Sequence, residues 1–357
     1  MHIPENYLSP STCAVMAAVM VPVWIHAVRK VKKEIPKTQM PMIGVGAAFS
    51  FLGMMFNVPM PGGTTGHAVG GTLIACLLGP NAACIAVTIA LLIQALLFGD
   101  GGILSFGANC FNMAFILPYV GFAIYRLLSK RLENENPQKN NRNKVISAAI
   151  GSYAGINAAA LCAAIEFGIQ PALFTNAEGQ ALYCPYGLDV SIPAMMAGHL
   201  TIFGAAEVIF TAAIFAFILK TSKDKKNIPA IDMTASEEEA EKNNFGFNSK
   251  KARKPLIILI VVLICAVPLG LLATGTAWGE WGADEISSIV NNGTTLGFTP
   301  QGMENGFSFE ALLPDYSVGN LPEVFGYILS AIIGVGILII IFRIISTCMK
   351  NKVDFKV

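Results

Sequence analysis

Two histidines in this chain stand where they could bind a metal ion together with the N-terminus. His2 is the second residue, so the α-amine of Met1, the amide nitrogen of residue 2 and the imidazole Nδ1 can close two fused chelate rings in one plane. His67 follows the glycine-rich stretch Pro61 to Gly66 and could add a fourth nitrogen, because imidazole is the commonest metal-ligating side chain. A square of four nitrogens suits Ni2+ or Cu2+ better than Mg2+, Ca2+ or tetrahedral Zn2+. The scheme requires Met1 to keep a free amine.

The same two histidines also have a structural interpretation. His2 could be a disordered terminal residue, and His67 a hydrogen-bonded histidine at the start of a helix. The residues alone leave both interpretations open. Two further polar residues, His199 and Glu207, are eight positions apart and therefore share one face of an apolar helix. For these two, and for Glu166 in another apolar segment, we expect structural polar contacts rather than metal binding.

The composition places these residues in a membrane protein. Of the 357 residues, 54% are hydrophobic and 13% are charged, and the mean hydropathy is +0.59. Soluble domains carry about 25% charged residues, so a soluble enzyme is excluded. The net charge of +1 excludes a nucleic-acid-binding protein, and the even spread of apolar residues excludes a single-span receptor. The eight cysteines are scattered without CxxC spacing and are interpreted as small packing residues.

The apolar runs predict an all-α polytopic membrane protein with about nine transmembrane helices. The 24 Lys and Arg residues fall in five clusters, and nine spans would place every cluster on one side. The positive-inside rule makes that side cytoplasmic, so we expect the N-terminus outside and the C-terminus in the cytoplasm. The predicted helices are 9–31, 41–57, 67–79, 81–98, 108–129, 145–168, 194–220, 255–276 and 323–347.

A charged segment divides the chain into two modules. Residues 222–254 mix both charges with little apolar content and are predicted to form a cytoplasmic linker. Before it lies a seven-helix module, 1–221, which holds both candidate metal-binding histidines. After it lies a two-helix module, 255–357, with an outer loop, 277–322, that is acidic and has no Lys or Arg. This loop could steer divalent cations or serve only to solvate the outer face.

Several motifs of residues 1–221 resemble the substrate-capture component of cobalt/nickel energy-coupling-factor transporters, the CbiM/NikM family. They are Met1-His2-Ile3-Pro4 with Leu8-Ser9-Pro10, Asn57 to His67, Gly79-Pro80, Gln94 to Gly102, Gly107-Ala108-Asn109 with Phe111-Asn112-Met113, and Gly198-His199 with Glu207. In that family the metal is held by the terminal amine, the amide and imidazole of residue 2, and the histidine after the glycine-rich loop. The resemblance therefore implies Met1, His2 and His67 as ligands.

Two departures from the family pattern occur. Glu5-Asn6-Tyr7 stands where the family commonly has an Asp-Gly pair, a change that removes no ligand. Residues 255–357 resemble the small accessory component of these transporters, of the CbiN/NikN type, by position and topology. The loop of this module, however, lacks the usual Asp-Gly-Leu-Glu string.

Five polar residues at the outer helix ends are candidates for a second shell that orients the ligands; the alternative is ordinary capping and interhelical hydrogen bonding. They are Asn57, Gln94, Asp100, Ser105 and Asn109.

The resemblance implies a plasma-membrane subunit of a prokaryote that captures Ni2+ or Co2+ for uptake, with no covalent cofactor. The chain has no GxxxxGK[ST] phosphate loop, so we expect ATP hydrolysis in separate cytoplasmic ATPase subunits, joined by a coupling transmembrane subunit. An alternative is a self-sufficient secondary permease driven by ions, although no convincing internal repeat supports it. A membrane metallopeptidase would need an acid–base motif such as HExxH, which is absent from the sequence. The residues do not choose between nickel and cobalt.

Overall fold

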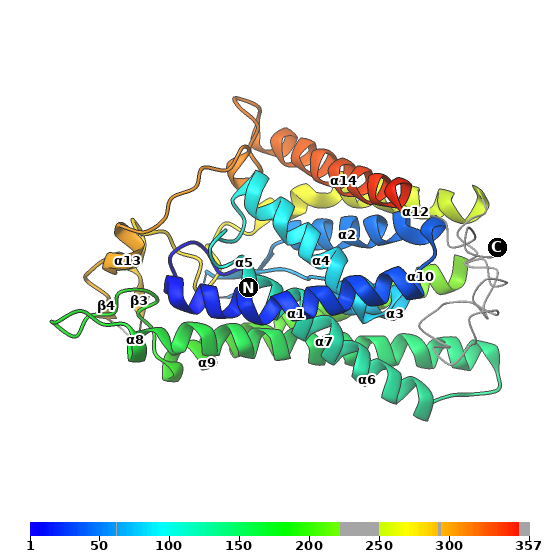
Figure 1. Cartoon of the computed structure of the whole chain (residues 1–357), viewed down its shortest axis with the longest axis horizontal. Coiled ribbons are helices and arrows are strands. Elements are labelled where there is room, and N and C mark those ends of the chain that lie inside the picture. Colours follow the sequence, from blue (N-terminus) through cyan, green and yellow to red (C-terminus); the bar gives the residue numbers. More distant parts are fainter. Residues whose placement is uncertain (62, 222–249, 292–293, 350–357) are drawn as a thin grey trace, which may run out of the picture.

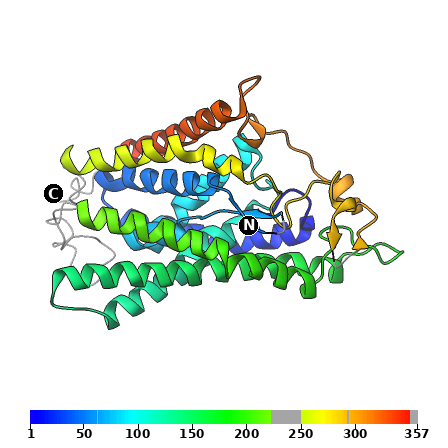
Figure 2. The same ribbon diagram turned by 180° about the vertical axis from the view of Figure 1, so that it is seen from behind.

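The computed structural model describes residues 1–61, 63–221, 250–291 and 294–349, and within these ranges the fold is built almost entirely of helices (Figures 1 and 2). Seven helical segments of this described part are long and apolar enough to cross a membrane. They are α1 (Pro10–Glu34); α4 (Pro80–Ile93) with the π-helix η2 (Gln94–Phe98); α5 (Phe106–Asn109) with the π-helix η3 (Cys110–Ile116) and α6 (Leu117–Arg131); α7 (Pro137–Gly168) with α8 (Gln170–Leu173); α9 (Leu188–His199) with α10 (Ile202–Thr221); α12 (Lys250–Ala266) with the 3-10 helix η6 (Val267–Leu272); and α14 (Glu323–Cys348).

Two other predicted spans are shorter than expected. The segment at 41–57 forms α2 (Met40–Met55), and the segment at 67–79 forms only α3 (Gly71–Leu78). A helix of eight residues is about 12 Å long, less than half of the hydrocarbon core of about 30 Å, so α3 does not cross a bilayer by itself. The physical reason lies at Gly70, whose φ of +71° is not helical, so α3 begins only at Gly71. The count of nine spans and their orientation remain predictions.

The predicted helix at 194–220 is two helices in the structure. α9 ends at His199 and α10 begins at Ile202. Gly204 permits this break, because a Cβ there would lie 2.2 Å from the carbonyl oxygen of His199. The break leaves His199 and Glu207 on separate helices, so the shared helical face expected from their spacing is not formed.

The segment between α2 and α3 carries a small hairpin. β1 (Val58–Pro59) pairs antiparallel with β2 (Thr65–Gly66), and His67 follows directly. The hairpin therefore brings His67 back toward the end of α2 and fixes where its side chain starts. A second hairpin, β3 (Val290–Asn291) with β4 (Thr294–Thr295), lies in the loop 277–322 of the C-terminal module.

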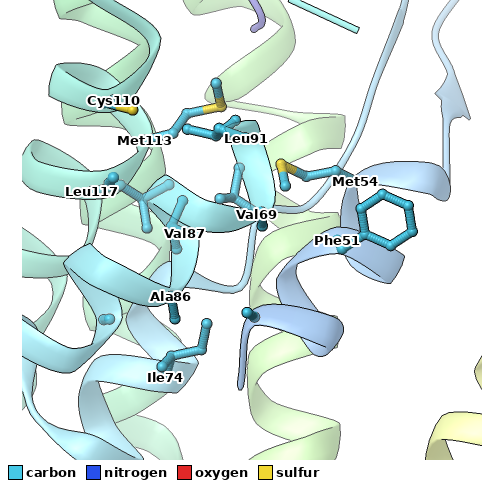
Figure 3. Packing of buried hydrophobic residues seen from close by; sticks show 14 of the residues in the cluster. Phe51, Met54, Val69, Ile74, Ala86, Val87, Leu91, Cys110, Met113 and Leu117 are labelled. Atoms are coloured by element: carbon cyan, nitrogen blue, oxygen red, sulfur yellow. The ribbon is translucent and has the colours of Figure 1, made fainter. Parts of the chain in front are cut away.

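The core is formed where α2, α3, α4, η3 and α6 meet (Figure 3). Large apolar side chains such as Phe51, Met113 and Leu117 are fully buried there. Close helix approach depends on glycine at the contact of α6 with α7, where a Cβ on Gly151 would lie 2.5 Å from the Gly121 carbonyl oxygen. Five of the eight cysteines are buried and none of the eight is in a disulfide, as expected for packing residues.

The C-terminal module packs along one side of the bundle and reaches over one end of it. α14 lies against α2, and α12 lies beside both (Figures 1 and 2). The connection between η6 and α14 contains η7 (Ile286–Ser288), α13 (Gln301–Glu304) and η8 (Pro314–Tyr316). Figure 1 shows α13, β3 and β4 near α8, at the end of the molecule opposite the C-terminal end of α14. Both views place the N-terminus among the helices, where Met1 is buried and its amine is bonded to Glu280 of this connection.

Candidate metal centre

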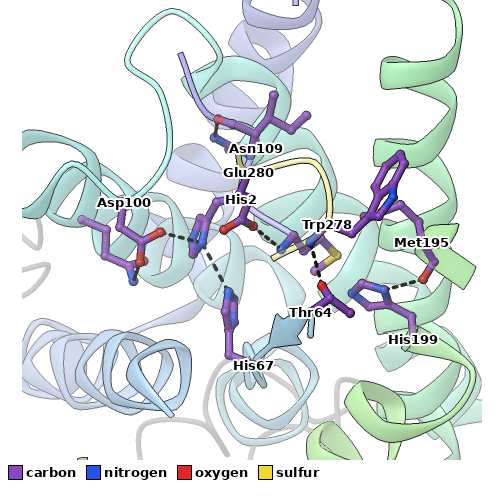
Figure 4. A network of polar contacts seen from close by, with 12 residues as sticks. His2, Thr64, His67, Asp100, Asn109, Met195, His199, Trp278 and Glu280 are labelled. Carbon is purple, nitrogen blue, oxygen red and sulfur yellow. Dashed lines mark hydrogen bonds and ion pairs between the residues drawn. The ribbon is translucent and has the colours of Figure 1, made fainter. Parts of the chain in front are cut away.

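The imidazoles of His2 and His67 meet inside the protein, although 65 positions separate them (Figure 4). Nδ1 of His2 lies 3.3 Å from Nε2 of His67, and the ring centroids are 4.9 Å apart. Both residues are buried, with 2% and 7% of their surfaces exposed. Metal–nitrogen bonds of about 2 Å would put neighbouring nitrogens of a square about 2.8 Å apart and opposite ones about 4 Å apart. The observed separation lies between these two values.

The N-terminus is held at the same place. The α-amine of Met1 donates to Oε1 of Glu280 at 2.8 Å, and Met1 is 5% exposed. The backbone of Ile3 is bonded on both sides: its N–H donates to Oδ1 of Asn109 at 2.7 Å, and its carbonyl accepts from Nδ2 of the same side chain at 3.0 Å. Oγ of Ser105 also donates to this carbonyl, at 2.6 Å. His2 is therefore a buried residue in a hydrogen-bonded terminus and not part of a free tail.

The turn that follows explains how Glu5 and Asn6 can replace an Asp-Gly pair. Asn6 has a φ of +63°, a left-handed conformation that glycine adopts most easily and asparagine next. Its side chain exchanges two hydrogen bonds with the backbone of Phe307 in the loop 277–322 of the C-terminal module. The Glu5 carboxylate accepts from the N–H groups of Ile103 and Leu104. Burial raises the pKa of Glu5, and these two backbone bonds partly offset that rise.

Asp100 holds His2 from the other side. Its Oδ1 accepts from Nδ1 of His2 at 2.9 Å, and its Oδ2 accepts from Nε2 of Gln94 at 3.2 Å. Burial alone would raise the pKa of Asp100, but the charge and hydrogen bond of His2 outweigh it and hold the pKa below its usual range. Gly101, with a φ of +87°, lets the loop pass close to the site, because a Cβ there would lie 3.1 Å from Nδ2 of Asn109 and 3.5 Å from Cδ2 of His2.

His67 is positioned by the segment that joins β2 to α3. Glu207, fully buried on α10, accepts the N–H of Val69 at 2.7 Å and that of Gly70 at 3.0 Å. Ser50 on α2 donates to the Val69 carbonyl at 2.7 Å. Burial, together with the nearby charges of His2 and the terminal amine, lowers the pKa of His67 well below its usual value. His67 is therefore held as a neutral imidazole, the form that binds a metal.

The structure brings most of the predicted residues to this centre. Gln94, Asp100, Ser105 and Asn109 all bond to His2, to Ile3 or to one another. Asn57 differs: it follows the end of α2, where its backbone N–H donates to the Met55 carbonyl, and no described hydrogen bond joins its side chain to the centre.

His199 and Glu166 are hydrogen-bonded within the helical bundle and not to the two imidazoles. Nδ1 of His199 contacts the Met195 carbonyl at 2.8 Å. Oε2 of Glu166 accepts from Nδ2 of Asn112 at 2.8 Å. Within the described residues, no group of three or more His, Cys, Asp and Glu side chains is arranged to hold a metal ion. A metal ion bound by the two imidazoles would therefore need further donors, and the amine of Met1 and the amide nitrogen of His2 adjoin the His2 imidazole along the chain.

Two residues of the C-terminal module touch the centre and were not found from the sequence. Glu280 pairs with the terminal amine, and Tyr316 donates its hydroxyl proton to Oδ2 of Asp100. The N–H of Trp278 also donates to Oγ1 of Thr64 at 2.8 Å, which links the loop 277–322 to the first hairpin. The only sequence feature that pointed to this loop was its acidic character and its lack of Lys and Arg.

Comparison with known families gives two matches that together cover most of the chain. The family described as the cobalt uptake substrate-specific transmembrane region, CbiM, matches residues 2–225. The PDGLE domain matches residues 253–351.

Relatives that match nearly the whole chain are fused proteins. A probable fused nickel transport protein, LarMN, of Lactiplantibacillus plantarum is 48% identical over 345 residues, covering 96% of this chain and 97% of the relative. The fused nickel transport protein NikMN of Rhodobacter capsulatus is 45% identical, and the match covers 95% of each chain. A crystal structure described as a truncated transition metal transporter is 58% identical with a TM-score of 0.57, and covers 62% of this chain and 99% of that one.

Proposed function

Because the chain belongs to the CbiM family and carries a PDGLE domain after it, we propose that it is the metal-capture subunit of an uptake system for Ni2+ or Co2+. It is a multi-pass membrane protein of the kind found in prokaryotic transport systems. The metal is bound by the amine of Met1, the amide nitrogen and Nδ1 of His2, and Nε2 of His67. The observation that carries this proposal is the buried contact between His2 and His67 beside the terminal amine.

Metal capture exchanges protons for the ion at this centre. In the structure, Nδ1 of His2 is bonded to Asp100 and the amine is bonded to Glu280, so both ligand nitrogens are held by carboxylates. An arriving cation replaces the protons that these nitrogens carry, as metal ligands must be deprotonated. Asp100 and Glu280 remain close to the ion and balance its double positive charge, which lowers the cost of burying it.

Nickel is the cargo that the donor set favours. Four nitrogens in a square suit Ni2+, and the usual affinity order places Ni2+ above Co2+. Two relatives that match nearly the whole chain are named as nickel transport proteins, which points in the same direction. We expect Co2+ to bind the same four nitrogens more weakly.

Release of the ion into the cell requires energy that this chain does not supply by itself. The sequence contains no phosphate-binding loop, so the proposal assigns ATP hydrolysis to separate cytoplasmic ATPase subunits and reorientation of this chain to a coupling membrane subunit. Named cobalt transport relatives of the CbiM type share part of this chain, which supports a role as one component of a larger system.

Binding and transport can be tested on the purified full chain. We expect Ni2+ titration, followed by d–d absorption, to show one site, and His67→Ala to weaken it by more than the 10- to 100-fold typical of outer-shell changes. In vesicles containing this chain alone, the proposal predicts binding without sustained Ni2+ accumulation. Accumulation driven by an ion gradient would instead show a secondary permease, and wild-type affinity in His67→Ala would remove His67 from the site.

A further inference from the structure

One side chain of the C-terminal module is inserted into the outer end of the N-terminal module. Tyr316, in η8, is buried, and its ring stacks on Phe98 with centroids 4.7 Å apart and planes 21° apart. A second aromatic contact joins it edge-on to Phe51 at 6.3 Å. The hydroxyl accepts from Nε2 of Gln94 at 2.9 Å and donates to Oδ2 of Asp100. A residue 216 positions away in the sequence thus completes the surroundings of Asp100.

The backbone that carries this side chain adopts an unfavourable conformation. Asp315 has a φ of +52° and Tyr316 a φ of +58°, so two consecutive residues other than glycine lie in the left-handed region. Such conformations persist only when the surrounding contacts determine them. Two contacts hold this turn: Oγ of Ser330 donates to the Tyr316 carbonyl at 2.8 Å, and the N–H of Leu313 donates to the Leu97 carbonyl at 2.7 Å. The turn is therefore built to place the Tyr316 ring and hydroxyl where they are.

We propose that Tyr316 is a positioning residue for the metal centre and acts through Asp100. The carboxylate of Asp100 accepts from Nδ1 of His2 through one oxygen and from Tyr316 and Gln94 through the other. Because Nδ1 gives up its proton when it binds the ion, the tyrosine hydroxyl fixes a carboxylate that positions His2 for capture and then lies beside the bound ion. The inference rests on the proposed function, because it assigns His2 as a ligand. It adds that the N-terminal module alone lacks part of the surroundings of its metal site. Hydrogen bonds connect His2 to Asp100 and Asp100 to Tyr316, and Tyr316 belongs to the PDGLE domain.

The Tyr316 hydroxyl makes the hydrogen bond to Asp100, whereas the Tyr316 ring makes the packing contacts. Removing the hydroxyl leaves the stack on Phe98 intact but leaves Oδ2 of Asp100 with Gln94 as its remaining described partner. Tyr327, on α14, provides a matched comparison in the same module. It is also buried, and its hydroxyl donates at 2.8 Å to the Met55 carbonyl, with no hydrogen bond to Asp100.

The test compares Tyr316→Phe with Tyr327→Phe in the full-length protein, using Ni2+ titration and the d–d absorption of the bound ion. We expect Tyr316→Phe to weaken Ni2+ binding by about tenfold and to shift the absorption band, because the Asp100 carboxylate beside the ion then loses one of the two donors that fix its Oδ2. Tyr327→Phe should leave both unchanged. Equal effects of the two substitutions, or none from either, would overturn the role of Tyr316 while leaving the proposed function in place.

A double-mutant cycle separates positioning through Asp100 from a general loss of stability. If Tyr316 acts through Asp100, then Tyr316→Phe has no further effect on Ni2+ affinity once Asp100→Asn is present. Additive losses would contradict the proposal, since they would show that the two residues act independently. Absence of Ni2+ and Co2+ binding in the wild-type chain would overturn the proposed function itself, and this inference with it.

Discussion

Replacing Glu207 by glutamine tests how the loop that carries His67 is held. Oε2 of the carboxylate accepts hydrogen bonds from the N–H groups of Val69 and Gly70, and Oε1 also accepts from the Gly70 N–H, at 3.2 Å. Hydrogen bonds to a charged group contribute about 1.5–3 kcal/mol each, whereas neutral ones contribute about 0.5–1.5 kcal/mol. If the glutamine amide oxygen keeps both hydrogen bonds, their combined contribution to stability falls by about 2 kcal/mol. The new NH2 group, which cannot accept, then faces the Gly70 N–H in place of Oε1.

The loss is expected at the metal centre, because the two N–H groups belong to the second and third residues after His67. A change of about 2 kcal/mol corresponds to roughly 30-fold in Ni2+ affinity if it is expressed wholly in the bound state. The assay is Ni2+ titration of Glu207→Gln beside a thermal unfolding curve of the same sample. Glu166→Gln is the matched control: Glu166 is also a buried helical carboxylate, but its described partner is Asn112.

We expect both glutamine variants to unfold at a lower temperature and only Glu207→Gln to bind Ni2+ more weakly. If the two variants keep the same Ni2+ affinity, the loop is not positioned by Glu207, and the reasoning from hydrogen bonds to ligand geometry is wrong.

Three further predictions concern the surroundings of the two imidazoles. Asn109→Ala removes both side-chain hydrogen bonds to the Ile3 backbone, so the backbone of the N-terminal residues is less firmly positioned. We expect this change to weaken Ni2+ binding about tenfold in titration. Gly101→Ala should lower the thermal stability by about 1–2 kcal/mol, since alanine is strained at a φ of +87° and its Cβ would crowd Asn109. Burial lowers the pKa of His67, so the folded protein favours the neutral imidazole. Without bound metal, the protein should therefore lose stability as the pH falls below about 6.5, the usual pKa of histidine in an unfolded chain. In unfolding curves recorded at several pH values, His67→Gln should make this loss of stability smaller.

The long helices could be predicted from the sequence because apolar runs near 20 residues have few other structures in a membrane. The errors occur where a single residue interrupts a run. Gly70 delays the start of the expected helix at 67–79 and leaves α3 with eight residues, and the break before Ile202 divides the expected helix at 194–220. Hydropathy does not detect such breaks, since the residues around them remain apolar.

The pairing of His2 with His67 was predicted from chemistry and from the family resemblance, and Asp100 and Asn109 were proposed as their neighbours. Glu280 and Tyr316 were not, because their partners lie 279 and 216 positions away and no periodicity or spacing links the segments. The acidic outer loop was expected at most to attract cations. Its actual contacts depend on how α14 packs against α2, which only the folded structure defines.

The proposed site depends most strongly on the free amine of Met1, and that group can be changed alone. Cys13 in α1 allows a synthetic peptide of residues 1–12, with or without an Nα-acetyl group, to be ligated to the remainder of the chain. Both products have the same side chains, and thermal unfolding reports whether each is folded. We predict that the folded unmodified chain binds Ni2+ and that the folded acetylated chain does not. Equal Ni2+ affinity in the two would contradict the terminal-amine chelate.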